Sequence, residues 1–442
     1  MAQAMGRKLA RRAGWTVATI AIITAALIFA ELSFAKVEMT AGGVNTRLLL
    51  PFMRGAIGIP VYSGTGEHVT IRGYLAGPVV RRKSDGNWSA TWFCEDTVKR
   101  TQGHGETLRI ECAGMTHDFP LAALPVANAI APMPDKLIVL SDIEGNSRFL
   151  GAALRKLGVV DTSGNWSFGN GHLVILGDSV DRGRDVFAVL WRLRTLAAQA
   201  EVANGAVHVL LGNHEQYLLR GNVSRAHPEY RYALQQLGGY TGAFANDSVL
   251  GEWLRRQPVA LKLGSVLFTH AGISPEVADA GLTIEALNQA MRDYWSSDAS
   301  IGAEPSPALD AVMGLDGVTR YRGYFRDSGN DRPAATQQDI EQILARYHAE
   351  RIVVGHTLVD QITHRYNGRV TGIDVNHPEA RPEVLVFDHG EPHIVDIGTA
   401  RGFEDDTGTR LREFSLFDAS DRKLLASIYR ANRTLARIPH PY

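Results

Sequence analysis

The sequence is poor in three things: charge of one sign, cysteine and long hydrophobic runs. Its 442 residues include 46 basic and 47 acidic side chains, for a formal net charge of −1. This balance gives no reason to expect a nucleic-acid partner. No internal repeat or low-complexity block is visible. With 45% hydrophobic and 21% charged residues, the composition is that of an ordinary globular chain, long enough for one large domain and something more.

The uncharged stretch Trp15–Ala30 near the N-terminus has only 16 residues, fewer than the ~20 that span a bilayer comfortably. Basic residues at positions 7, 8, 11 and 12 precede it, and Ser33 and Ala35 offer small side chains at −3 and −1 of a cut before Lys36. We therefore expect residues 1–35 to be a signal peptide or, if uncleaved, a membrane anchor. Either way the bulk of the chain would be extracytoplasmic, in the periplasm or facing outward.

Only two cysteines are present, and both end β-like runs, Trp88–Cys94 and Thr107–Cys112, with a polar turn expected over Lys99–Glu106. In an oxidising compartment we expect a disulfide between Cys94 and Cys112. Without export, the pair would be buried free thiols.

Five short runs rich in Val, Ile and Leu are each followed directly by polar residues. They are too short for helices and are typical of buried strands: Leu137–Leu140, Leu173–Leu176, Val207–Leu211, Val266–Thr269 and Ile352–Val354. Amphipathic segments, Phe149–Leu157 and Val186–Ala198, separate the first three, which is the spacing of βαβ units. Ligands of such sheets bind outside the carboxyl ends of the strands, so the polar residues should converge there.

The residues after these strands are suited to binding metal. Asp142 and Asp178 lie 36 residues apart, and Asn213 comes 35 residues later. A carboxylate such as Asp178 can bridge two cations about 3.5–4 Å apart, an Asn offers a carbonyl oxygen, and His270 and His356 offer imidazole nitrogens. Each alone could be a helix cap, a turn residue or a core histidine. Five in order, each after a strand, predict a two-metal site for phosphoester hydrolysis.

The segments GDSVDRG, LLGNHE, LFTHAG and VVGHT resemble the signatures of calcineurin-like metallophosphoesterases, and within them of the phosphoprotein-phosphatase branch. Leu358 stands where other branches have a further His, which also favours this branch. From Asp142 to about Asp396 the layout is similar to that of Shewanella-like protein phosphatases. The resemblance implies an α/β fold, a metallophosphoesterase sandwich of mixed sheets flanked by helices, here preceded by a small β module.

The resemblance also implies two metal-ligand sets. One metal would be held by Asp142, Glu144 and Asp178, and the other by Asp178, Asn213, His270 and His356. His214 would be the general acid, oriented by Asp181.

The resemblance also implies that arginines bind the phosphoryl group. Arg182 would clamp it with its planar fork. A second phosphate-binding arginine is expected between the two His motifs, and we choose Arg322, with Arg320 as the alternative.

One position departs from the family pattern, because Glu144 stands where Asp-x-His would place a histidine after Asp142. A Glu can bind through oxygen, and a shell richer in carboxylate favours Mn or Fe over Zn, which stays a candidate. Alternatively, Glu144 points away and the first metal is weak or absent.

The expected activity is that of a dinuclear metal-dependent phosphatase, in which a metal-bridging hydroxide attacks the phosphorus of a phosphorylated substrate. A Ser/Thr or Tyr phosphoprotein is the substrate that the resemblance implies. Alternatives are a nucleotide or dinucleoside polyphosphate hydrolase, and an envelope binding module with a crippled phosphatase core. The expected organisation is a signal or anchor at 1–35, a β module at 59–125, a catalytic domain at 136–400 and a helical extension at 401–442.

Overall fold

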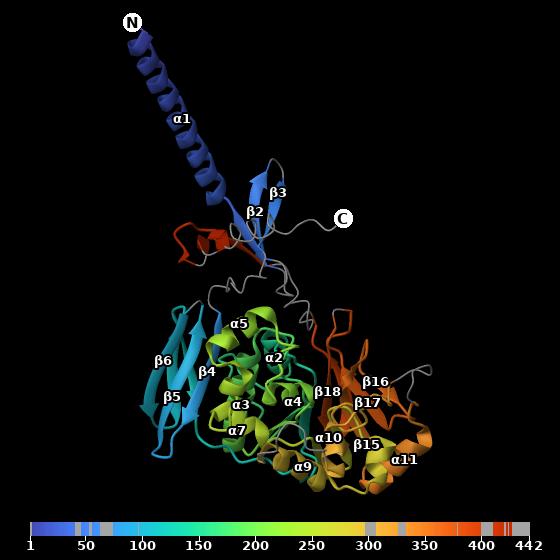
Figure 1. The fold of residues 1–442 in the computed structure, drawn as a ribbon. Helices are drawn as coiled ribbons and strands as arrows, with labels where there is room; N and C mark the ends of the chain where they lie inside the picture. The colour runs from blue at the N-terminus through green and yellow to red at the C-terminus, as the bar shows by residue number, and fades with distance from the viewer. Residues whose placement is uncertain are drawn as a thin grey trace. The chain divides into compact units, whose positions relative to one another are not determined.

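The computed structural model describes most of the chain. The described ranges are 2–39, 46–52, 55–61, 74–95, 97–296, 306–325, 333–377, 379–398, 410–419, 421–422 and 424–426. They divide into two compact units, one comprising Met1–Thr70 with Thr407–Tyr442 and the other comprising Ile71–Asp406 (Figure 1).

The first unit consists of a long helix and an antiparallel sheet. Its elements are α1 (Ala2–Ser33), β1 (Lys36–Met39), β2 (Thr46–Phe52), β3 (Gly55–Val61) and β20 (Arg410–Glu413), with the strands in the order β20-β1-β2-β3. A small core forms around Val37, Leu48 and Phe414. Among the helices that the structure describes, none is long and apolar enough to cross a membrane.

Strand β20 lies in the C-terminal extension, which the sequence predicts to be helical. It pairs antiparallel with β1, placing Arg412 opposite Val37. The helix-like stretch from 421 to 438 is described only at 421–422 and 424–426, and the remainder lies outside the described residues.

The second unit opens with five strands: β4 (Leu75–Arg82), β5 (Asn87–Cys94), β6 (Thr97–His104), β7 (Thr107–Cys112) and β8 (Met115–Pro120). They form a β4-β5-β6 sheet and a β7-β8 hairpin. The expected turn at Lys99–Glu106 is wrong, because strand β6 occupies most of it. Among the described strands β6 pairs only with β5, and it is largely exposed, so backbone hydrogen bonds rather than an apolar face hold its polar sequence in the sheet.

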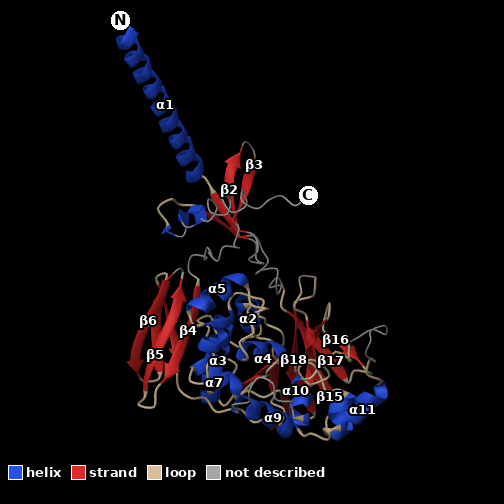
Figure 2. Ribbon diagram, viewed as in Figure 1, coloured by secondary structure: helices blue, strands red, loops and turns tan. Residues whose placement is uncertain are grey.

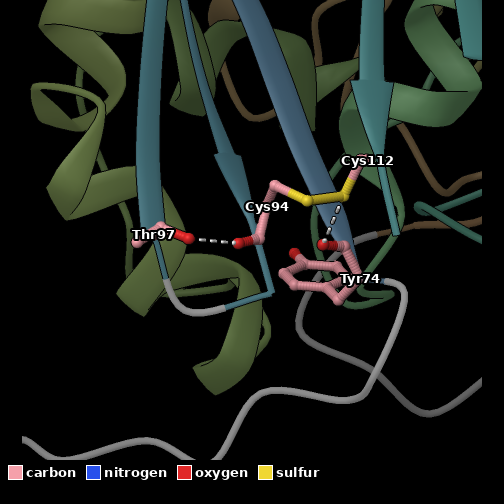
Figure 3. The surroundings of a disulfide bond; sticks show 4 residues. All are labelled: Tyr74, Cys94, Thr97 and Cys112. Atoms are coloured by element: carbon pink, nitrogen blue, oxygen red, sulfur yellow. Dashed lines mark hydrogen bonds between the residues drawn. A yellow bond between two sulfur atoms is a disulfide. The ribbon is translucent and has the colours of Figure 1, made fainter. Parts of the chain in front are cut away.

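Cys94 and Cys112 form a disulfide with their Cα atoms 5.7 Å apart, joining the ends of β5 and β7 (Figure 3). The Cys112 sulfur also contacts the carbonyl oxygen of Tyr74 at 3.7 Å. The bond therefore ties the three-stranded sheet, the hairpin and the entry into β4 together.

Two larger mixed sheets form the centre of this unit. The five-stranded sheet has the order β12-β11-β10-β18-β19, and the six-stranded sheet the order β16-β17-β15-β14-β13-β9. Their strands are β9 (Ile130–Ala131), β10 (Lys136–Leu140), β11 (His172–Ile175), β12 (Ala206–Val209), β13 (Ala260–Leu263), β14 (Val266–Thr269), β15 (Arg351–Leu358), β16 (Thr363–Arg365), β17 (Val370–Asp374), β18 (Glu383–Asp388) and β19 (Glu391–Asp396). All five predicted strands are present.

The two sheets pack face to face, as alternation along β10 shows. Leu137 and Val139 point into a core shared with Phe268 of the other sheet, whereas Ile138 and Leu140 point into the core under the helices. The predicted sandwich of mixed sheets is confirmed.

Helices cover the outer faces (Figure 2). They are α2 (Ser147–Lys156), α3 (Val186–Val202), α4 (Asn213–Leu219), α5 (Pro228–Gln236), α6 (Gly239–Ala243), α7 (Val249–Arg255), α8 (Pro275–Asp279), α9 (Ile284–Ser296), α10 (Pro307–Met313) and α11 (Gln337–Arg346). Helices α3, α5 and α7 contact β4, so the small β sheet packs directly on the catalytic part.

Candidate active site

The candidate site lies at the strand ends, where the backbone takes an uncommon conformation. Six of the predicted site residues have left-handed backbone angles, with φ of 48° at Asp142, 48° at Glu144, 50° at Asp178, 68° at Asp181, 47° at Arg182 and 64° at His356. Residues other than glycine rarely adopt such angles, and where they do the strain commonly marks a functional site. The turns after β10 and β11, and the irregular stretch of β15 between Val354 and Leu358, are thus shaped to aim side chains inward.

Two glycines of the motifs make room for these turns. A Cβ at Gly212 would collide with the carboxylate of Asp178, and a Cβ at Gly355 would collide with Asp142. Close approach of the backbone to both carboxylates therefore requires glycine.

Four of the predicted ligands converge on one point. Single donor atoms of Asp178, His270 and His356 all lie within 4.8 Å of one another. His270 Nε2 is 3.2 Å from Asp178 Oδ2, 3.2 Å from Asn213 Oδ1 and 3.1 Å from His356 Nδ1. The other nitrogen, His270 Nδ1, lies 2.7 Å from the Leu176 carbonyl oxygen and donates to it, which leaves Nε2 facing the cluster.

The ligands expected for the other metal lie beside this group. Donor atoms of Glu144, Asp178 and His214 fall within 4.8 Å of one another, so Glu144 points into the site rather than away. Asp142 is buried next to them, where its Oδ2 accepts from the Ser141 hydroxyl and from the His356 backbone N–H at 3.0 Å.

His214 and Asp181 form the expected pair. His214 Nδ1 is 3.0 Å from Asp181 Oδ2, and its Nε2 lies 3.8 Å from Asp178 Oδ2. Burial opposes protonation, but the two aspartates raise the pKa of His214 above its ordinary value. The imidazole is thus a proton donor placed against the metal ligands.

Two supporting residues of the site were not predicted, Tyr240 beside Asp181 and Glu215 beside Asp178. The Tyr240 hydroxyl on α6 donates to Asp181 Oδ1 at 2.6 Å, so Asp181 is held from both sides. Glu215 accepts from the backbone N–H groups of Asp178, Ser179 and Gly212 at 2.6–2.9 Å, and burial together with Asp178 raises its pKa to about 7. Glu215 thereby fixes the turn that aims Asp178.

The arginines line the partly exposed edge. Arg182 Nε pairs with Glu144 Oε1 at 2.9 Å while 45% of the Arg182 side chain stays exposed. Arg322 donates to the His356 carbonyl oxygen at 2.7 Å. Burial lowers the pKa of Arg322, and the negative charges of Asp142 and Asp178 oppose that effect. Arg320 instead lies over the ring of Tyr217, 5.4 Å from its centroid.

The charge of the site fits bound cations. Besides Asp142, Glu144 and Asp178 the structure also buries the carboxylate of Asp374, at the end of β17. Burial raises the pKa of Asp142, Glu144 and Asp374, and although burial opposes it, Asp178 raises the pKa of His270 to about 10. Such a surplus of negative charge calls for positive ions, and the mixed oxygen and nitrogen donors suit divalent metals.

Asp374 was also missed, as was Asn376, whose Nδ2 donates to Glu144 Oε2 at 2.9 Å. Asp374 is the last residue of the buried strand β17 (VTGID), so the strand-end rule that found the other carboxylates applies to its position, although Thr371 and Gly372 weaken the apolar signal. No sequence pattern marks Asn376 or Tyr240, because their partners lie far away in the chain.

Comparison with known proteins agrees with this site. A sequence model of the family described as calcineurin-like phosphoesterase matches residues 136–360. The crystal structure of a cold-active protein-tyrosine phosphatase of a psychrophilic Shewanella species is 29% identical, covers 76% of this chain and 99% of its own, and superposes with a TM-score of 0.67.

Two curated relatives match smaller parts. Shewanella-like protein phosphatase 1 of Plasmodium berghei is 28% identical over 231 residues, which is 50% of this chain and 61% of that protein. The symmetrical bis(5'-nucleosyl)-tetraphosphatase of an Acidovorax species is 40% identical over 108 residues, 24% of this chain and 34% of that protein. Since the family match spans half of the chain and the fold agrees, the chain belongs to the calcineurin-like phosphoesterase family and is a metal-dependent phosphatase.

Proposed function

We propose that this chain is a protein phosphatase that removes phosphate from phosphorylated side chains with the help of two divalent cations. The observation that carries the proposal is the His214–Asp181 pair beside Asp178, with Nδ1 3.0 Å from the Asp181 carboxylate. This arrangement places a proton donor next to a metal-ligand cluster, as phosphate-ester cleavage requires.

One cation would be held by Asp142, Glu144 and Asp178, and the other by Asp178, Asn213, His270 and His356. When bound, the cations supply Lewis-acid activation of water and of the phosphoryl oxygens. The carboxylate-rich first set supports Mn or Fe, with Zn as a third candidate.

The chain's own residues do the rest. His214 gives its Nε2 proton to the leaving oxygen, and Asp181 and Tyr240 keep its imidazole aligned. Arg182 and Arg322 reach the exposed side of the site, where guanidinium groups neutralise the equatorial phosphoryl oxygens.

The protein substrate is supported by two relatives named as protein phosphatases, one of which this chain covers almost completely. The dinucleoside tetraphosphatase relative matches over a shorter segment, so polyphosphate hydrolysis is the second candidate. The third expectation, a binding module with a crippled core, loses the support that it drew from Glu144, because Glu144 lies in the ligand group.

A substrate panel tests the proposal. The Mn-loaded protein would be assayed with p-nitrophenyl phosphate, with peptides carrying phosphoserine, phosphothreonine or phosphotyrosine, and with a dinucleoside tetraphosphate. We expect the highest kcat/KM on a phosphopeptide. Preference for the tetraphosphate would replace this proposal with the second candidate.

We also propose that the protein is extracytoplasmic. The basic N-terminal residues, the uncharged stretch at 15–30 and the disulfide between Cys94 and Cys112 support this location. Strand β1 begins at Lys36, so a cut before that residue would leave the first sheet whole. N-terminal sequencing of the protein from a cell-envelope fraction tests it, and a cytoplasmic protein that begins at Met1 would refute it.

A further inference from the structure

Glu144 poses a question that the family pattern does not answer, because a carboxylate occupies the place of a ligating imidazole. Imidazole is rigid and has one ligating nitrogen at a time, whereas a Glu side chain has more rotatable bonds and two equivalent oxygens. A Glu in this place needs something to fix its orientation. The structure offers two partners, Arg182 on Oε1 at 2.9 Å and Asn376 on Oε2 at 2.9 Å.

Asn376 is built for this task. Its Nδ2 donates to Glu144 Oε2 and also to the backbone carbonyl oxygen of Asp142 at 2.6 Å. One amide group therefore spans the two residues that begin the first ligand set. The residue is 8% exposed, so water competes little for these hydrogen bonds.

The position of Asn376 is itself fixed. It comes two residues after β17, and its backbone N–H donates to Asp374 Oδ1 at 3.2 Å, which closes a tight turn at the strand end. Strand β17 lies beside β15, which carries His356. The Asn376 amide therefore reaches the ligands from the end of β17, a strand that carries none of the predicted metal ligands.

Arg182 is less suited to hold Glu144 throughout the reaction. Its side chain is 45% exposed, and the same guanidinium is the predicted clamp for the incoming phosphoryl group. An Arg that turns to the substrate releases Glu144, whereas Asn376 is neutral, buried and has no competing anion to bind.

We propose that Asn376 is a positioning residue that orients Glu144 as a ligand of the first cation. It gives the Glu144 carboxylate the fixed orientation that an imidazole would have because of its rigid ring. The inference rests on the proposed two-cation site. Partners that orient metal ligands typically change metal affinity by about 10- to 100-fold when removed. The effect should fall on one cation only, because Asn376 touches neither His270 nor Asn213 in its hydrogen bonds.

The test is metal binding without substrate. Apo protein would be titrated with Mn²⁺ by calorimetry, and bound metal counted by mass spectrometry, for wild type, Asn376→Ala and Asn376→Asp. We expect Asn376→Ala to weaken one cation about 10- to 100-fold and to leave the other within about twofold. Asn376→Asp is nearly isosteric, and it should weaken the same cation more, because it replaces a donor with a second negative charge.

Two controls separate positioning from general damage. Asn288→Ala removes another buried Asn, whose hydrogen bonds go to the Val259–Ala260 backbone rather than to Asp142 or Glu144, and it should lower the melting temperature without weakening the first cation. In a Glu144→Ala background, Asn376→Ala should cause no further loss, because it acts through Glu144. Equal weakening of both cations, an unchanged titration, or the same loss in the Glu144→Ala background would overturn the inference.

If wild type binds two cations but hydrolyses none of the substrates in the panel, the proposed function fails while this result still stands.

Discussion

At the scale of single residues, Asp178 is the side chain on which most contacts of the site converge. Its Oδ1 accepts from the His214 backbone N–H at 2.9 Å, and its Oδ2 faces His270 and His214. Burial would raise the pKa of Asp178, but these imidazoles lower it overall, so the carboxylate stays ionised. An ionised carboxylate shared by both ligand sets is suited to bridging two cations.

Replacing Asp178 tests the bridge. We expect Asp178→Asn to reduce activity to background and bound metal to fewer than two ions per chain, as measured by mass spectrometry. Asp161→Asn, which alters a surface turn that closes onto Asn165, is the matched control and should keep both. Near wild-type turnover in Asp178→Asn would disprove the bridging assignment.

His214 is expected to matter most for poor leaving groups. His214→Asn should slow hydrolysis of an alkyl phosphate by about 10²- to 10⁴-fold, because the alkoxide needs its proton. The loss on p-nitrophenyl phosphate should be much smaller, since nitrophenolate leaves without protonation. Equal losses on both substrates would remove His214 from the acid role.

The pH profile should report on Asp181. This carboxylate raises the pKa of His214, so Asp181→Asn lowers that pKa and the acid loses its proton at a lower pH. For an alkyl phosphate the alkaline limb of the kcat profile should therefore move to lower pH. A limb that stays in place, with turnover lowered equally at every pH, would mean that Asp181 only supports the fold.

At the scale of elements, a segment between two motifs supports the site. Residues 220–257 form α5, α6 and α7, and the Tyr240 hydroxyl on α6 donates to Asp181. The β4-β5-β6 sheet rests on α3 and α7, where Arg82 pairs with Glu252 and Arg81 with Asp247. The β module is therefore attached to the catalytic part by packing and by ion pairs.

Reducing the disulfide should destabilise the β module more than the active site. We expect the free energy of unfolding of the module to fall by about 2–4 kcal/mol, and amide hydrogen exchange to speed up in β5 and β7 more than in β10 and β11. The comparison is hydrogen exchange with and without reductant, with the Cys94→Ser/Cys112→Ser double variant as a check on the reductant. Faster exchange spread evenly over all four strands would contradict this prediction.

At the scale of the whole molecule, the buried charges of the site make stability depend on metal and pH together. Without metal, Asp178 raises the pKa of His270 to about 10 against the opposing effect of burial, and burial raises the pKa of Asp142, Glu144 and Asp374. The folded chain then holds protons that the unfolded chain has already released at neutral pH. Stability from such groups is lost as pH rises towards the folded pKa.

We therefore expect the chelator-treated protein to lose stability between pH 7 and 9. One proton held only by the folded state costs about 1.4 kcal/mol per pH unit. With Mn²⁺ bound, the cations replace these protons, and the slope should flatten or reverse. Urea unfolding at several pH values, with and without Mn²⁺, measures it, and identical slopes would show that the carboxylates do not bind the metal.

The sequence alone determined which side chains stand at the end of each strand. Runs of three to five residues rich in Val, Ile and Leu are typical of buried strands, and the polar residues after them emerge at the carboxyl ends of those strands. This reasoning located Asp142, Asp178, Asn213, His270 and His356, and the same strand-end rule applies to Asp374. The polar strand β6 escaped it, because an edge strand shows no apolar face.

Only the tertiary structure decided how these side chains are aimed and supported. The inward orientation of Glu144 depends on Asn376, which is 232 residues away in the sequence. The alignment of Asp181 depends on Tyr240 of helix α6. Such contacts leave no periodic trace, because a hydrogen bond between distant segments constrains two single positions rather than a pattern. Local propensity therefore specified the strands and the order of the ligands, while the packing of sheets and helices specified the geometry that makes them a site.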